Sequence, residues 1–303
     1  MTAAERIWRP TYAPDLGLLA RHRRGAGDPT YRIEDGRHWR ALRTPTGPAT
    51  LMVHVASGEV HARAWGPGAE WALDAVPALL GAADNPDDFE VADERLAAVA
   101  ARYGVPRFGR SGLVMESLVP SIIEQKVTGQ EAFAGFRRLV HRYGEAAPGP
   151  GADQRLRLQP TAAELLRIPS WAWLRLPVDP ARSRAVLTAA RVAASLERTV
   201  GLPGQEVDRR LRSLGGIGEW TAAEVRQRAH GDPDAVSFGD YHVAKDVGHA
   251  LTGAEWDDEQ LRSFLEPYRG HRNRVVGLVY RAAGARPRRG PRMSPRTHLP
   301  ARV

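Results

Sequence analysis

Apolar residues recur every three to four positions along most of the chain, and only the first third departs from this helical spacing. From Thr30 the period changes to two, which is typical of strands with one buried face. Asp35-Gly36 predicts a hairpin turn, and the apolar run ATLMVHVA predicts a buried strand. The predicted strands span 31–33, 38–43, 49–56 and 60–64, and a helix over 69–80 follows them. Strands followed by a helix indicate a small α+β unit.

A polar segment, 81–90, carries Asn85-Pro86 and predicts a domain boundary. Beyond it, helices are predicted over 93–103, 113–126, 130–143, 161–166, 180–196, 207–214, 219–229, 243–251, 256–265 and 272–283. The expected fold class is therefore α+β, with a small N-terminal antiparallel sheet domain (1–86) and a larger all-α domain (87–284). We expect an entry segment over 1–20, with Trp8 and Tyr12 as anchors, and we expect Trp171–Trp173 to staple a loop to the core. Residues 285–303 are rich in Pro, Gly and Arg and predict a disordered basic tail.

The most informative motif is a glycine-rich turn between two predicted helices. The helix predicted over 207–214 is followed by Gly215-Gly216-Ile217-Gly218, and the next predicted helix starts at Glu219. Two helices joined by such a turn can direct several backbone N–H groups at one point, which is how proteins bind phosphate. Glycine suits the turn because it accepts positive φ and has no Cβ to hold a phosphate away. Ile217 is the expected apolar plug between the helices.

This pattern resembles the helix-hairpin-helix DNA glycosylase superfamily. Leu214 to Ala222, LGGIGEWTA, matches the hairpin that grips the DNA backbone, with Gly215 in place of the usual proline. Phe238-Gly239-Asp240-Tyr241 matches the segment that carries the catalytic aspartate. Within the superfamily the chain looks most like the bacterial 3-methyladenine DNA glycosylase II branch. The resemblance covers most of 90–284 and implies a helix-hairpin-helix glycosylase domain there.

The resemblance implies that Asp240 is the catalytic carboxylate. Breaking an N-glycosidic bond builds positive charge on C1′ and O4′ of the sugar, and a carboxylate beside that carbon stabilises it and orients the attacking water. The base must first leave the stack and enter a pocket. By position alone Asp240 also has the alternative role of capping the helix that follows.

The implied base pocket contains Trp220, Glu224 and Tyr268. Trp220 stands where relatives that also nick the backbone carry a Schiff-base lysine, so a monofunctional enzyme is expected. Trp220 and Tyr268 would stack on the base, with positions in the core as the alternative. Glu224 lies one turn after Trp220 and would attract cationic bases alkylated at N3 or N7. An exposed Glu224, or one paired with Arg228, is the competing interpretation.

The resemblance also implies a set of DNA-binding residues. In the hairpin these are Gly216, Ile217, Gly218 and Thr221. Gln125 and Lys126 would lie at the DNA face, near the gap left by the flipped base, and Lys126 departs from the usual apolar or amide wedge. Arg269 would face a phosphate.

Charge and cysteine content add to this picture. Of the net charge of +8, six positive charges lie in 285–303, so the remainder is only mildly basic, which still suits a nucleic-acid partner. The absence of cysteine excludes disulfides and cysteine-ligated zinc or iron–sulfur sites. No side-chain metal site or cofactor is expected, although the resemblance allows a monovalent cation on hairpin carbonyls. No apolar stretch approaches eighteen residues, so we expect a soluble, cytoplasmic, nucleoid-associated monomer.

The sequence thus predicts a monofunctional base-excision-repair glycosylase acting on double-stranded DNA with damaged bases. Its expected substrates are alkylated purines of the 3-methyladenine and 7-methylguanine type. Two alternatives stay open: a glycosylase for another lesion such as uracil or an oxidised purine, and a non-catalytic helix-hairpin-helix DNA-binding protein. A pure binder would not need Asp240 at this distance from the hairpin.

Overall fold

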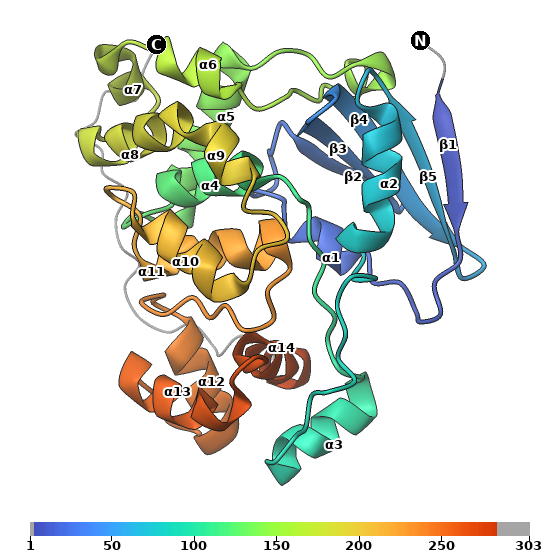
Figure 1. The fold of residues 1–303 in the computed structure, drawn as a ribbon, viewed down its shortest axis with the longest axis vertical. Helices are drawn as coiled ribbons and strands as arrows, with labels where there is room; N and C mark the ends of the chain where they lie inside the picture. The colour runs from blue at the N-terminus through green and yellow to red at the C-terminus, as the bar shows by residue number, and fades with distance from the viewer. Residues whose placement is uncertain (1–2, 284–303) are drawn as a thin grey trace.

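The computed structural model describes residues 3–283, in which a five-stranded sheet packs beside a larger helical assembly (Figure 1). The strands are β1 (Ala4–Trp8), β2 (Tyr31–Glu34), β3 (Arg37–Thr44), β4 (Gly47–Ala56) and β5 (Glu59–Trp65). Their spatial order is β1-β5-β4-β3-β2, and every neighbouring pair is antiparallel. The predicted α+β fold class, with the antiparallel sheet first and the helices after it, is confirmed.

The helices account for most of the remaining described residues. They are α1 (Gly17–Ala20), α2 (Ala69–Leu79), α3 (Glu94–Tyr103), α4 (Val114–Ile123), α5 (Gly129–Tyr143), α6 (Ala162–Leu166), α7 (Ser170–Arg175), α8 (Pro180–Arg191), α9 (Ala193–Glu197), α10 (Gly204–Arg212), α11 (Glu219–Val225), α12 (Val243–Thr252), α13 (Asp258–Leu265) and α14 (Arg272–Ala283). Two 3-10 turns, η1 (Gly149–Gly151) and η3 (Glu266–Tyr268), and a π-helical turn, η2 (Arg226–His230), complete the list. No helix within 3–283 has the length and apolarity needed to cross a membrane.

Two segments form elements that the sequence pattern does not predict. The entry segment contains β1, which is ordered by pairing with β5, a strand more than fifty residues away. Trp171–Trp173, predicted to staple a loop to the core, belong to α7, which buries Trp173 at 1% exposure and leaves Trp171 at 55%. Distant partners stabilise both short elements, because neither is long enough to be stable by its own pattern.

The apolar residues gather into separate cores. One face of the sheet packs with α2 into the sheet core, which contains Leu51 and Val76. A first helical core runs through α4, α5, α8, α10 and α11, and a second one joins α3 to α12, α13 and α14. Leu113, just before α4, is buried in the sheet core, so the two predicted domains share apolar contacts. The limits at 86 and 284 stay predictions, and the predicted tail, 285–303, lies outside the described residues.

Buried ion pairs also join distant segments. Arg24 donates to Glu124 at 2.9 Å, Arg40 pairs with Glu116, and Arg274 donates to Asp84 at 2.7 Å. The side chains of Arg274 and Asp84 are 0% and 5% exposed. Removing one partner of such a pair leaves the other charge buried without compensation, which is costly.

We therefore expect Asp84→Asn to lower the free energy of unfolding by about 3 to 5 kcal/mol. Urea titration followed by circular dichroism measures this change. Asp74→Asn is the matched control, because the pair of Asp74 with Arg6 lies at the surface and should contribute little. Equal midpoints for the two variants would contradict the structural role of the buried pair.

Candidate active site

The turn between α10 and α11 has a backbone conformation that requires glycine at Gly216. Gly216 has a φ of +89°, and a Cβ added there would lie 2.9 Å from the Cβ of Ala185 on α8. Ile217 is 6% exposed and packs into the first helical core, so it plugs the space between the helices. Gly215 and Gly218 are exposed and an added Cβ would meet nothing within 4 Å. The outer side of the turn is thus open for a ligand.

The connection between α4 and α5 lies against this turn. The Gln125 side-chain nitrogen donates to the Gly216 carbonyl at 2.9 Å and to the Thr221 hydroxyl at 2.8 Å. Gln125 and the buried Thr221, both predicted to bind DNA, are therefore engaged with each other and brace the hairpin. Lys126 is exposed and has a φ of +53°, a backbone conformation that a residue other than glycine seldom adopts. The fold thus places Lys126 at the surface beside the hairpin.

Asp240 is held in one orientation at the start of α12. Its Oδ1 accepts hydrogen bonds from the backbone nitrogens of His242 at 2.7 Å and Val243 at 3.3 Å, so it caps the helix. Its Oδ2 accepts a hydrogen bond from the indole nitrogen of Trp220 at 3.2 Å. Asp240 and Trp220 are both half-buried, so each keeps an exposed part. The helix cap and the contact with the hairpin helix therefore use different oxygens of one carboxylate.

Helix α13 supports the segment that carries Asp240. The Asp258 carboxylate accepts a hydrogen bond from the Gly239 nitrogen at 2.7 Å. Arg262 donates to Glu219 at 2.6 Å, and its guanidinium lies 3.7 Å from the centroid of the Phe238 ring. These contacts tie the aspartate segment to the first turn of α11 from the other side.

A cavity of about 370 Å³ lies between α1, α11 and α14, and neither Asp240 nor Trp220 lines it. Ser237 and Val243, three residues before and three after the aspartate, line it, and so does Glu224, one turn along α11 from Trp220. Arg21, which follows α1, and Asn273, on α14, line the opposite part. Pockets of 300–1,000 Å³ are the usual size for small ligands, and the exposed residues Asp15, Arg21 and Arg281 leave this one open to solvent.

Glu224 both lines the cavity and pairs with Arg228, so each of the two interpretations of its position is partly right. It is 9% exposed and lines the cavity, but its Oε2 accepts from Arg228 Nη1 at 2.6 Å and its Oε1 from the Ser237 hydroxyl at 2.6 Å. Burial by itself would raise the pKa of Glu224, but the Arg228 charge and the two hydrogen bonds lower the pKa below its usual value. The carboxylate is therefore ionised and already neutralised by Arg228.

Tyr268 and Arg269 lie away from this cavity. Tyr268 is 7% exposed, packs in the second helical core near Phe264, and accepts a hydrogen bond from the Asp93 nitrogen at 3.2 Å through its hydroxyl. Arg269 pairs with Glu266 at the surface. The structure thus places Tyr268 in the core, the alternative that its position also allowed, and stacking of its ring on a base stays a prediction.

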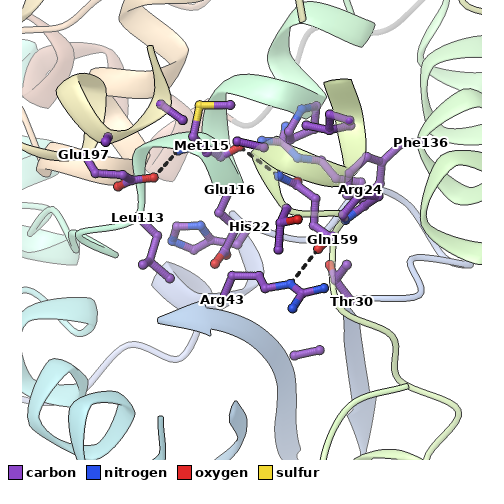
Figure 2. A pocket seen from close by; sticks show the side chains of 18 residues that line it. His22, Arg24, Thr30, Arg43, Leu113, Met115, Glu116, Phe136, Gln159 and Glu197 are labelled. Atoms are coloured by element: carbon purple, nitrogen blue, oxygen red, sulfur yellow. Dashed lines mark hydrogen bonds between the residues drawn. The ribbon is translucent and has the colours of Figure 1, made fainter. Parts of the chain in front are cut away.

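Several residues that face the cavity carried no signal in the sequence. Arg21, Ser237 and Asn273 belong to three segments separated by up to 250 positions, and no spacing rule connects them. A second, more enclosed cavity of about 220 Å³ lies between the sheet and α4 to α6 (Figure 2). In it, Gln159 connects Arg43 to Met115 by hydrogen bonds of 2.9 and 3.0 Å. None of its lining residues comes from the hairpin or the Asp240 segment.

Within 3–283, no group of three or more histidine, aspartate and glutamate side chains is placed to hold a metal ion. The hairpin carbonyls of Leu214 and Gly216 accept hydrogen bonds from the Ile217 nitrogen and from Gln125. A monovalent cation at the turn would have to share these oxygens, and such a cation stays a prediction.

Comparisons with known proteins agree with this architecture. No family model matches the chain. The chain is 30% identical over 151 residues to the probable bifunctional transcriptional activator/DNA repair enzyme AlkA of Mycobacterium tuberculosis, a match that covers 49% of this chain and 30% of that protein.

Among solved structures, the 3-methyladenine DNA glycosylase of Archaeoglobus fulgidus superposes with a TM-score of 0.75 at 20% identity, covering 91% of this chain and 98% of that one. The Clostridium acetobutylicum 8-oxoguanine glycosylase/lyase bound to DNA gives a TM-score of 0.70 at 13% identity, covering 93% and 97%. At these identities the superpositions show that the chain shares the fold of these glycosylases, and it spans less than a third of the length of the curated relative that it matches.

The hairpin geometry generates a paired test. We expect Gly216→Ala to destabilise the protein by about 1 to 3 kcal/mol, because the new Cβ would meet Ala185 in a strained backbone conformation. Gly215→Ala should change stability little, since the space around it is open. Thermal unfolding of the two variants checks this, and a larger loss for Gly215→Ala would contradict the described turn.

Proposed function

We propose that this chain is a monofunctional DNA glycosylase that hydrolyses the N-glycosidic bond of damaged purines in double-stranded DNA during base-excision repair. The observation that carries the proposal is the half-buried Asp240 carboxylate, which accepts a hydrogen bond from the indole of Trp220 in the first turn after the hairpin. A protein that only bound DNA through its hairpin would not need a carboxylate held at this place.

The proposed reaction uses groups that the fold already orients. The C1′–N bond breaks and its electron pair leaves with the base, while positive charge develops on the sugar. Asp240 stabilises that charge, and the oxygen of a water molecule bonds to C1′ as its proton passes to the carboxylate. Hydrogen bonds to both carboxylate oxygens hold Asp240 for this task without reorganisation.

We propose that the open turn between α10 and α11 binds the DNA backbone. Backbone N–H groups at Gly216 and Gly218 would meet a phosphate, whereas the Ile217 N–H is bonded to the Leu214 carbonyl. Lys126 would contact the backbone or the opposite strand. Gln125 and Thr221 support this surface by bracing the turn. Trp220 offers its half-exposed indole as one wall for the flipped base. We further propose a cytoplasmic, nucleoid-associated monomer that works without a cofactor.

Two lesion classes compete within this function. The first is alkylated purines of the 3-methyladenine and 7-methylguanine type, supported by the names of the Mycobacterium tuberculosis and Archaeoglobus fulgidus relatives. The second is neutral oxo-purines such as hypoxanthine or 8-oxoguanine. It is favoured by the pairing of Glu224 with Arg228, which removes the free negative charge expected to attract a cationic base.

Asp240→Asn is expected to slow base release at least a hundredfold under single-turnover conditions, because the neutral amide cannot balance the developing charge. Binding to DNA with an abasic site should be retained. Asp258→Asn is the control: it removes a neighbouring charge but keeps an acceptor for the Gly239 nitrogen. Normal turnover by Asp240→Asn would overturn the proposed role.

The wild-type protein should leave the abasic strand unbroken, because the indole of Trp220 cannot form a Schiff base. Denaturing electrophoresis before and after hot-alkali treatment distinguishes base release from strand cleavage. A covalent protein–DNA adduct trapped with borohydride would contradict the monofunctional assignment.

A further inference from the structure

The enclosed cavity between the sheet and α4 to α6 has hydrogen-bond acceptors on its wall that are not in use (Figure 2). Gln159 is 7% exposed, and its Oε1 has no hydrogen-bond partner within residues 3–283. The same holds for the buried Oε2 of Glu116, whose Oε1 pairs with Arg40. Buried acceptors without donors are costly, so this wall favours a ligand that brings N–H groups.

The wall also carries a carboxylate without a cationic partner. Glu197, at the end of α9, accepts hydrogen bonds from the backbone nitrogens of Val114 and Met115, both at 2.8 Å, and forms no ion pair in the described part of the chain. Burial raises the pKa of Glu197 and the nearby Glu116 carboxyl raises it further, although the two backbone hydrogen bonds oppose the shift. Positive charge in the cavity would therefore be stabilised.

The arginines on the same wall are already neutralised. Arg24 donates to Glu124 at 2.9 Å, and Arg43 donates to Glu145 at 2.5 Å. Burial and the arginines around it hold the pKa of His22 well below its usual value, so the ring is neutral and one of its nitrogens is an acceptor. A ligand in this cavity thus meets acceptors and one uncompensated negative charge.

Much of the remaining wall is apolar. Leu113, Met115, Phe136 and Leu165 all line the cavity. Its volume of about 220 Å³ is several times the share of one water molecule in the liquid, which is about 30 Å³. An apolar cavity with a few polar groups on one part of its wall suits a small organic ligand.

We propose that this cavity binds a small, free primary alkylamine in its protonated form. The ammonium group has three N–H donors, and the wall offers acceptors at Gln159, Glu116 and His22. Its charge offsets that of Glu197, and its alkyl chain lies against the apolar part of the wall. The proposal is independent of the glycosylase chemistry, because no lining residue comes from the hairpin or the Asp240 segment.

The probe is n-butylammonium chloride, added to the full chain while the melting temperature is followed. Tetramethylammonium chloride, which has no N–H group, and 1-butanol, which has no charge, are the matched ligands. We expect a saturable rise in melting temperature with n-butylammonium alone, since only a ligand that binds the folded state raises it. No such rise, or an equal rise with either matched ligand, would overturn the proposal.

Two variants locate the site by calorimetric titration. Gln159→Met and Glu197→Gln should each weaken n-butylammonium binding roughly ten- to a hundredfold, the loss expected for one hydrogen bond or contact to a charged group. Gln130→Met makes the first replacement at an exposed position of α5 outside the cavity and should bind like wild type. Melting temperatures without ligand check the folding of each variant.

Equal affinities of Gln159→Met, Glu197→Gln and Gln130→Met would show that the amine binds elsewhere and would refute the assignment. Nα-acetyl-lysine N-methylamide carries the same ammonium group on a peptide backbone that is too large for the cavity. It should bind more weakly than n-butylammonium. Tighter binding would identify the occupant as a lysine of another protein and would overturn the assignment to a free amine.

Discussion

The hydrogen bond from the Trp220 indole to the Asp240 carboxylate joins two helices whose apolar faces belong to different cores. Helix α11 buries Ala222 and Val225 in the first helical core, whereas α12 buries Val247 in the second. The candidate catalytic group therefore lies at the seam where the two helical cores meet. Since each side packs its own apolar residues, the seam can present a partly exposed carboxylate without weakening either core.

The seam is held together by polar contacts rather than by apolar burial. Arg262 reaches from α13 to Glu219, and Ser237 reaches Glu224 on α11. On an open surface, the charged and hydroxyl groups that make these bonds would be hydrated instead. Together they fix the distance between the hairpin and the aspartate segment, which proximity-dependent catalysis requires.

The effective charge of Glu224 depends on the residues around it. Glu224 taken alone suggests attraction for a cationic base, but its partner Arg228 comes from the same helix surface and cancels that charge. Arg21, from the N-terminal part of the chain, lies at the same cavity as Glu224. The net charge that a side chain presents is therefore set by its neighbours in space, and the sequence pattern does not name them.

The sequence by itself determined the periodicities and therefore the α+β class, the position of the hairpin, and the pairing of a glycine turn with Asp240 twenty-two residues after Gly218. These features are local, so propensity and spacing specify them. It did not reveal β1 or α7, because distant partners stabilise both. Nor did it decide between the core and the base pocket for Tyr268, or bring Arg21, Ser237 and Asn273 to one cavity. Only the tertiary structure decided these, because contacts between segments depend on how whole cores pack and not on neighbours along the chain.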